Sequence, residues 1–332
     1  MRWLITGGCG FIGANLVASL VEQGGAGIRV VDNLSVGNRD DLRHACDYRE
    51  LDPAALGASG PVEGAEVELV VGGILDEELA LRVTQGVDVI VHLAASTGVA
   101  PSVADPRRDC LMNVVGTLNY LEGARHNGVR RFVYASSGAA LGEQEPPLHE
   151  NLVARPVSPY GASKLCTEAY GSAYFRTFGV ETVGLRFSNV YGPRSRHKES
   201  AIHRFIKRAL VGEQWEVYGD GNQTRDFIFV EDLNSAIMQA ARVAGIGGEV
   251  FQIATNVETS LLEVIRILER VLMDAGVEMV PIQHGEPRRG DVKRNYADTS
   301  KAQCLLQWRA TVDLTEGLRR TVNWYAAVSN RV

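Results

Sequence analysis

The stretch Arg2-Trp3-Leu4-Ile5-Thr6-Gly7-Gly8-Cys9-Gly10-Phe11-Ile12-Gly13 decides the fold of this 332-residue chain. Its first five residues predict a buried strand, and the apolar positions Leu16, Val17 and Leu20 predict that a helix follows the glycines. Glycines at 7, 10 and 13 allow a tight turn, a close approach of backbone N–H groups to a diphosphate, and packing of the helix against the strand. The chain therefore opens with a strand, a glycine turn and a helix.

A second strand completes this unit. The run from Ile28 to Val31 ends at Asp32, about twenty residues after the glycine turn, where a carboxylate can accept hydrogen bonds from the ribose diol of a dinucleotide. Asp32 followed by Asn33 favours NAD over NADP, because a carboxylate repels a 2′-phosphate. Arg39 is a nearby cation that weakens this preference.

Strand and helix patterns alternate through the first half of the chain. Further strands are predicted at 66–71, 87–93, 131–135 and 182–187. Helices are predicted at 77–83, 108–125, around Tyr160, and at 200–211, 231–244, 260–275 and 314–327. The alternation indicates an α/β fold with a doubly wound parallel (Rossmann) sheet. We predict an NAD-binding domain of residues 1–180, with a strand and helix from about 225–255, interleaved with a smaller α/β substrate-binding region of residues 181–332.

The composition is that of a water-soluble enzyme, with 45% hydrophobic and 22% charged residues. No apolar run is long enough to span a membrane, and the N-terminus lacks the basic head of a signal peptide, so we expect a cytoplasmic protein without a membrane partner. Five scattered cysteines without a CxxC spacing or a histidine cluster indicate neither a disulfide framework nor a metal site. The net charge of −6 disfavours a nucleic-acid partner.

Tyr160 and Lys164 are four residues apart, a spacing that sets a phenol beside an ammonium on a helix. A neighbouring cation lowers the pKa of a phenol, which makes it a better base. Ser137, directly after the strand at 131–135, is predicted to lie at the same rim and to pass a proton between a substrate oxygen and Tyr160. Alone, the spacing also fits a solvated helix face and the serine also fits a turn. The glycine turn and Asp32 favour the catalytic interpretation.

The chain resembles the extended short-chain dehydrogenase/reductase family, and within it the UDP-sugar 4-epimerases. The resemblance covers nearly the whole chain. The motifs that carry it are Thr6 to Gly13, Asp32-Asn33-Leu34-Ser35, His92-Leu93-Ala94-Ala95, Tyr160 with Lys164, Leu185 to Arg194, Gly219-Asp220-Gly221 followed by Arg225-Asp226-Phe227, and Pro287-Arg288-Arg289-Gly290-Asp291. This resemblance implies NAD as the cofactor, a UDP-sugar as the substrate, and a homodimer with a face around 111–120 and 165–174.

The resemblance also implies roles for individual residues. Tyr160 is implied as the catalytic base, Lys164 as its activator and a ligand of the nicotinamide ribose, and Ser137 as the hydroxyl partner. The implied NAD ligands are Gly7, Gly10, Phe11, Ile12, Gly13, Asp32, Asn33, Ser35, Ile74, Leu93, Ala94, Ala95, Tyr160 and Lys164. The implied substrate ligands are Ser136, Ser137, Asn189, Arg196, Arg225, Arg288 and Asp291. Gly73 stands where relatives usually carry an Asp, so adenine recognition is expected to rely on backbone or on Ile74.

The residues beside Ser137 discriminate among the reactions of the family. Dehydratases that resemble this chain carry an Asp-Glu pair there and decarboxylases a Glu, whereas this chain has Gly138 and Ala139. Without an additional acid or base, the chemistry predicted is removal and return of a hydride through a 4-keto sugar, which is 4-epimerisation. A non-catalytic NAD-sensing protein and a net oxidoreductase that releases NADH are the alternatives.

The sugar depends on the residues around C2 and C6. In relatives that act on UDP-glucuronate, a loop similar to the one at Arg196 brings an arginine to the C6 carboxylate, which favours UDP-glucuronate to UDP-galacturonate as the reaction. A solvated basic loop would instead fit UDP-glucose and UDP-galactose. Asn295, at a position that is a bulky tyrosine in some strict glucose/galactose enzymes, would admit UDP-N-acetylglucosamine.

Overall fold

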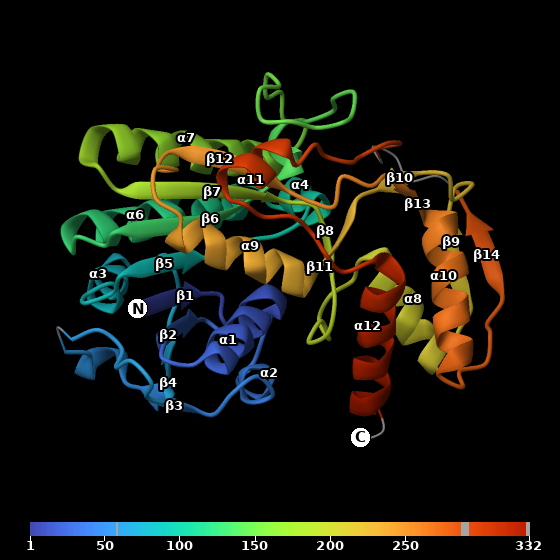
Figure 1. The fold of residues 1–332 in the computed structure, drawn as a ribbon, viewed down its shortest axis with the longest axis horizontal. Helices are drawn as coiled ribbons and strands as arrows, with labels where there is room; N and C mark the ends of the chain where they lie inside the picture. The colour runs from blue at the N-terminus through green and yellow to red at the C-terminus, as the bar shows by residue number, and fades with distance from the viewer. Residues whose placement is uncertain (58, 287–291, 330–332) are drawn as a thin grey trace.

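The computed structural model describes residues 1–57, 59–286 and 292–329. Its centre is an eight-stranded, wholly parallel sheet with the strand order β12-β7-β6-β5-β1-β2-β4-β3 (Figure 1). The strands are β1 (Arg2–Thr6), β2 (Gly27–Asp32), β3 (Tyr48–Leu51), β4 (Val67–Val71), β5 (Val89–His92), β6 (Arg131–Ser137), β7 (Glu181–Phe187) and β12 (Glu249–Ile253). The predicted doubly wound α/β fold is confirmed.

Both faces of the sheet are buried, which explains why central strands such as β1 and β5 are largely apolar runs. In β1, Trp3 and Ile5 belong to one hydrophobic core and Leu4 to the core on the opposite face, as alternation along a strand requires. One face is covered by α3 (Glu77–Val83), α6 (Gly116–His126) and α7 (Pro159–Phe178). The other face is covered by α1 (Phe11–Gln23), α9 (Val230–Arg242) and α11 (Ser300–Leu305).

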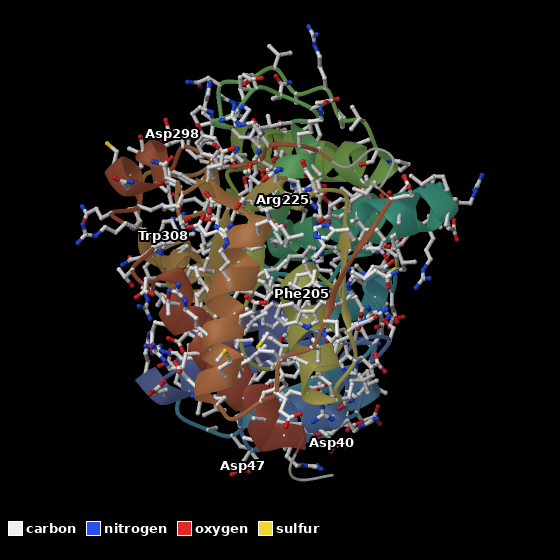
Figure 2. All side chains as sticks on the ribbon, turned by 90° about the vertical axis from the view of Figure 1, so that its right-hand side faces the viewer. Asp40, Asp47, Phe205, Arg225, Asp298 and Trp308 are labelled. Carbon is white, nitrogen blue, oxygen red and sulfur yellow. The ribbon has the colours of Figure 1, made fainter. Side chains whose placement is uncertain are left out.

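A smaller layer lies beyond the carboxyl ends of the strands. It contains α8 (Ala201–Leu210), β9 (Trp215–Tyr218), α10 (Leu261–Asp274), β14 (Ile282–Gly285) and α12 (Leu314–Ser329). Phe205 and Trp215 are fully buried in its own core, and the Trp215 indole N–H donates to the Phe205 carbonyl at 2.9 Å. Figure 2 looks at this side, with α10 in front and Phe205 and Arg225 to one side of it.

Further short elements follow the strands of the sheet. They are α2 (Arg39–Arg43), α4 (Val99–Ala104), α5 (Pro106–Cys110), the strand pair β8 (Asn189–Tyr191) and β11 (Phe227–Phe229), and the pair β10 (Thr224–Arg225) and β13 (Thr259–Ser260). The division of the chain at residue 180 stays a prediction. The sheet itself includes β7, which begins at Glu181.

Among the elements that differ from the sequence-based prediction, two have a clear physical reason. The helix expected at 108–125 is α5 and α6 joined by a π-helical turn at 111–115, a feature that often marks functional sites. Strand β3 escaped prediction because it is an edge strand with two exposed charged residues, Arg49 and Glu50, and therefore lacks a buried apolar run. Among the described residues, no helix is both long enough and apolar enough to cross a membrane.

Candidate functional site

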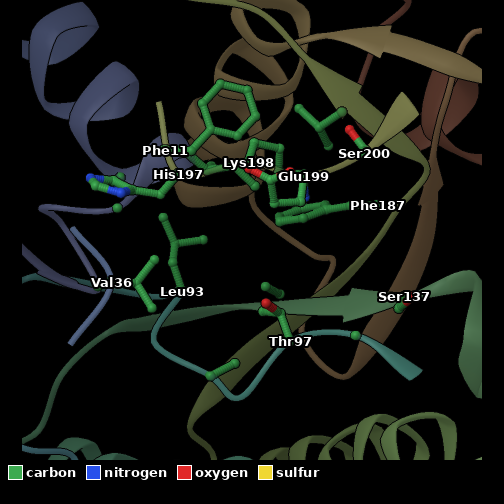
Figure 3. Close-up of a pocket in the computed structure, with 18 of the residues that line it drawn as sticks. Phe11, Val36, Leu93, Thr97, Ser137, Phe187, His197, Lys198, Glu199 and Ser200 are labelled. Carbon is green, nitrogen blue, oxygen red and sulfur yellow. The ribbon is translucent and has the colours of Figure 1, made fainter. Parts of the chain in front are cut away.

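A cavity of about 970 Å³ lies at the carboxyl ends of the strands, between the sheet and the smaller layer (Figure 3). Its position agrees with the rule that ligands of doubly wound sheets bind at this edge. The cavity brings together the predicted site residues Gly7, Gly10, Phe11, Ile12, Gly13, Asp32, Asn33, Ser35, Ile74, Leu93, Ala94, Ala95, Ser136, Ser137, Tyr160, Lys164, Asn189 and Arg225. Their individual roles remain predictions.

The glycine turn leaves no room for side chains on its inner side. A Cβ added at Gly13 would lie 2.2 Å from the Gly7 carbonyl oxygen and 2.6 Å from the Gly8 Cα. Gly7 has a φ of +71°, and a Cβ there would lie 2.8 Å from the Ala94 nitrogen. The turn therefore packs the start of α1 against the residues after β1 and β5, backbone to backbone, and this close packing is what glycines provide at the diphosphate of a dinucleotide.

Asp32 closes the other end of this cradle. Its carboxylate accepts the backbone N–H of Cys9 at 2.9 Å and that of Leu34 at 2.8 Å. Burial raises its pKa above the ordinary value, while these two hydrogen bonds lower it. Because each oxygen keeps a second lone pair, the carboxylate can still accept from a ribose hydroxyl.

The structure strengthens the preference for NAD over NADP. Arg39, the cation that weakened this prediction, makes a bidentate pair with Glu50, with both N–O distances at 2.8 Å. It does not line the cavity. The Asn33 side chain accepts the Ser35 backbone N–H at 3.1 Å and so shapes the loop after Asp32. At Gly73 an added Cβ would meet open space, whereas Ile74 is buried and lines the cavity.

Tyr160 and Lys164 lie in the first turns of α7. The helix starts at Pro159, after Ser158, whose hydroxyl accepts the Gly161 N–H at 3.1 Å. The Lys164 ammonium is buried, donates to the Ala135 carbonyl at 2.9 Å, and lies 5.8 Å from the centre of the Tyr160 ring. Ser137, at the end of β6, shares a hydrogen bond with the Tyr160 hydroxyl. The three groups predicted to be catalytic therefore meet at one rim.

Burial acts on the Tyr160 phenol in the direction opposite to the effect expected of the neighbouring Lys164. Burial raises the pKa of Tyr160, the Ser137 hydrogen bond lowers it, and the negative charge of Asp109 raises it again. Burial also lowers the pKa of Lys164 to about 8, although Asp109 and Glu168 act in the opposite direction. The Tyr160 phenol and the Lys164 ammonium are therefore both desolvated in the folded protein. The helix spacing alone could not predict this burial.

Ser136 was predicted to bind substrate, but its hydroxyl is bonded within the protein. Its hydroxyl donates to Glu168 at 2.5 Å, and Glu168 in turn accepts two hydrogen bonds from Arg186, at 2.8 and 2.7 Å. All three side chains are buried. The Ser136 hydroxyl therefore donates its hydrogen bond within the protein and not to a substrate. This hydrogen-bond network joins β6, β7 and α7 next to Ser137 and Lys164.

Asn113, in the π-helical turn, is a site residue that sequence reasoning missed. Its amide donates to the Ser96 carbonyl, the Asp109 carboxylate and the Ser163 hydroxyl, each at 3.0 Å, and its oxygen accepts the Ser96 N–H at 2.8 Å. It therefore joins the loop after β5 to α7 next to Lys164. A buried amide within an otherwise apolar helix pattern was the available signal.

On the substrate side, the predicted residues differ in their placement. Asn189 and Arg225 line the cavity, and the Arg225 guanidinium donates to the Thr224 and Val292 carbonyls at 2.7 Å each. Arg288 and Asp291 lie outside the described residues. Asn295 does not line the cavity.

Arg196 is not where the prediction placed it. Its side chain is exposed and does not line the cavity. The preceding residue, Ser195, is buried and bonded to the Gly192 carbonyl at 2.6 Å and to Tyr325, which turns the following residue outward.

Other basic side chains of the same loop line the cavity instead. Arg194, His197 and Lys198 all line it. Arg194 donates to the Asn15 side chain at 3.2 Å, and His197 contacts the Asp41 carboxylate at 3.0 Å, so the loop is fastened across the start of α1 and α2. Sequence reasoning singled out only Arg196 because nothing in a loop sequence tells which side chains point inward.

Comparisons with known proteins agree with this geometry. The NAD dependent epimerase/dehydratase family matches residues 3–254. UDP-glucose 4-epimerase of Mycolicibacterium smegmatis is 35% identical over 330 residues, covering 98% of each chain. A dTDP-glucose 4,6-dehydratase of an Actinoplanes species is 34% identical over 328 residues, also covering 98% of each chain.

The solved structure of UDP-glucuronic acid 4-epimerase from Bacillus cereus, in complex with UDP-glucuronic acid and NAD, superposes with a TM-score of 0.85 and 29% identity. The match covers 99% of this chain and 100% of that one. The protein is therefore an enzyme of the NAD dependent epimerase/dehydratase family, with NAD as its cofactor and UDP-sugar 4-epimerases, which are isomerases, among its relatives.

Proposed function

We propose that this protein is an NAD-dependent UDP-sugar 4-epimerase. The observation that carries the proposal is the rim formed by Tyr160, Ser137 and Lys164, next to a cradle that fits NAD. The residues that follow Ser137 are Gly138 and Ala139, which supply no acid for elimination of water. This absence separates the chain from the dehydratase chemistry of the family.

Tyr160, Ser137 and Lys164 have different roles in the proposed proton transfer. Tyr160 accepts the proton of the sugar 4-hydroxyl, and Ser137 shares the hydrogen bond that guides this transfer. Lys164, in its protonated form, stabilises the phenolate and holds the ribose beside it. When bound, NAD supplies a reversible hydride acceptor for C4 and a positively charged ring. Return of the hydride to the opposite face of the sugar inverts C4.

The cavity supports a neutral hexose, UDP-glucose or UDP-galactose, as the first candidate substrate. The prediction of UDP-glucuronate rested on Arg196, which is exposed and outside the cavity. C6 lies two bonds from C4, so its substituent must sit near Tyr160, where Thr97, Ser137 and Ser188 contribute hydroxyls to the lining. UDP-glucuronate is the second candidate, since hydroxyls can also bind a carboxylate and the UDP-glucuronic acid 4-epimerase is a similar structure.

The test is to incubate the purified protein separately with UDP-glucose, UDP-glucuronate and UDP-N-acetylglucosamine, and to resolve the 4-epimers by chromatography. We expect epimerisation of UDP-glucose without net consumption of NAD. Turnover only with continuous NADH release would contradict the epimerase proposal. Faster conversion of UDP-glucuronate would leave that proposal intact and reverse the order of the sugars.

The predicted homodimer stays part of this proposal. Leu111, before α6, and Tyr170, on α7, are 42% and 38% exposed on helices that pack against each other. Burial of such side chains against a second copy would stabilise a dimer. Light scattering should then give twice the mass of the chain, and the mass of one chain would contradict the dimer.

A further inference from the structure

Lys198 differs from the other basic side chains that line the cavity. Each of the other basic side chains has a partner within the protein. Lys164 donates to the Ala135 carbonyl, Arg194 contacts Asn15, His197 contacts Asp41, Arg204 lies over the Tyr218 ring, and Arg225 donates to the Thr224 and Val292 carbonyls. Within the described part of the chain, the Lys198 ammonium has no hydrogen bond, no ion pair and no aromatic ring. An ammonium without a partner in a confined cavity is unfavourable unless an anion joins it.

The backbone of Lys198 is held in place while its side chain is not. Its N–H donates to the Ser195 carbonyl at 2.9 Å, and its carbonyl accepts from the Lys207 ammonium at 3.0 Å. Lys207 also pairs with Glu199. Glu199, the next residue of the loop, is therefore paired with Lys207 and not with Lys198. The backbone hydrogen bonds fix the position of Lys198 at the edge of the cavity.

Lys198 lies on the side of the cavity next to Phe11, away from the catalytic side (Figure 3). Burial lowers its pKa, and its charge acts on His203, whose ring lies 5.8 Å from that of Phe11. Phe11 is the first residue of α1, directly after the glycine turn. Figure 3 shows Lys198 near Phe11, with Thr97 and Ser137 on the other side of the cavity.

We propose that Lys198 binds a diphosphate oxygen of a nucleotide held in this cavity. The inference rests on the proposed function, in which a sugar C4 lies at Tyr160 and the diphosphate, attached to C1 across the ring, lies away from it. NAD and a UDP-sugar both contain this group, so the chemistry of the ligand is the same for either. A lysine suits it because an ammonium is a compact charge that pairs with phosphate oxygens.

Calorimetric titration of the full chain tests the assignment with three ligands: UDP in the presence of saturating NAD, NAD alone, and uridine, which lacks the diphosphate. We expect Lys198→Met to weaken either UDP or NAD by about 10-fold to 100-fold. The ligand that is weakened identifies the source of the diphosphate. Lys198→Arg, which keeps the charge, should recover most of the affinity, and uridine binding, followed by ligand-observed NMR, should not change.

Arg270→Met is the matched control, because it removes one positive charge from an exposed position on α10 outside the cavity. It should leave all three affinities unchanged. Unchanged UDP and NAD affinities in Lys198→Met would overturn the assignment, as would an equal loss for uridine. UDP-glucuronate, titrated in addition, gives one more outcome: a loss of affinity confined to it would overturn the assignment, because the ligand would then be the C6 carboxylate. These readouts need no turnover, so wild-type protein that binds UDP without epimerising it would refute the proposed function alone.

Discussion

The two walls of the cavity are built on different physical principles. The sheet-edge wall, made of Gly7 to Gly13, Leu93 to Ala95, Ala135 to Ser137, Tyr160 and Lys164, is held by backbone packing and buried hydrogen bonds. The loop wall, made of Arg194 and residues 197–202, is held by side-chain contacts between segments far apart in the chain, such as Arg194 to Asn15. The residues predicted on the first wall line the cavity, although the Ser136 hydroxyl is bonded to Glu168, whereas Arg196 of the loop lies outside the cavity.

The difference shows why cofactor sites are easier to predict than substrate sites. A backbone turn with glycines has one workable shape, so its sequence implies its geometry. The direction of a side chain on a loop depends on contacts that only the folded chain makes. We therefore expect substitutions on the sheet-edge wall to have the larger effects.

The largest effect is expected for Tyr160→Phe on the sheet-edge wall. Loss of the proton acceptor should lower kcat by about 100-fold to 10,000-fold. NAD should still bind, because the glycine turn and Asp32 are untouched. Steady-state kinetics and NAD titration measure both. Tyr48→Phe, outside the cavity, is the matched control and should retain activity. Full activity in Tyr160→Phe would show that the chemistry lies elsewhere.

Gly13→Ala tests the backbone packing of the same wall. The new methyl would collide with backbone at Gly7 and Gly8, which cannot move without opening the turn. We expect the free energy of unfolding to fall by about 1–3 kcal/mol and NAD affinity to fall with it. Urea denaturation and NAD titration provide the measurements. Gly57→Ala, where an added Cβ meets open space, should change neither. A Gly13→Ala protein of native stability would contradict the crowding seen at this turn.

Asp109→Asn should move the pH profile without removing a catalytic group. The Asp109 charge raises the pKa of both Tyr160 and Lys164, so its loss should lower both. The whole pH profile of kcat/KM, which depends on the protonation of both groups, should therefore shift to lower pH. The side-chain oxygen of the new asparagine can still accept the hydrogen bond from the Asn113 amide, so the local structure should be kept.

The control for this shift is Asp274→Asn, at the exposed end of α10, which should leave the profile unchanged. Equal profiles for wild type and Asp109→Asn would show that this carboxylate does not influence the rim. A lower rate at every pH without a shift would point to a purely structural role of Asp109.

The smallest effect is expected for Arg196→Met, in the loop that carries the loop wall but outside the cavity. Because this side chain is exposed, the ratio of rates for UDP-glucuronate and UDP-glucose should stay the same. Parallel assays with the two sugars measure that ratio. A selective loss of UDP-glucuronate turnover would restore the original prediction for Arg196 and would show that the loop wall moves inward when substrate binds.

Most of the parallel sheet and the cofactor cradle could be predicted because their signals are local. Buried strands such as Val89–His92 and glycines at fixed spacing leave few alternatives. The edge strand β3 and the π-helical turn were missed, since the first depends on pairing with β4 and the second on what Asn113 meets in three dimensions. The electrostatics of the rim were also missed, because burial is a property of the fold.

The sequence by itself determined the fold class, the preference for NAD through Asp32, and the grouping of Tyr160, Lys164 and Ser137, because short-range geometry and strand order place these residues. The tertiary structure alone decided the direction of Ser136 toward Glu168, the exposure of Arg196 and the inward position of Lys198. The physical reason is the same in each case: the partner that orients the side chain lies on a distant segment, and desolvation acts only once the chain has folded.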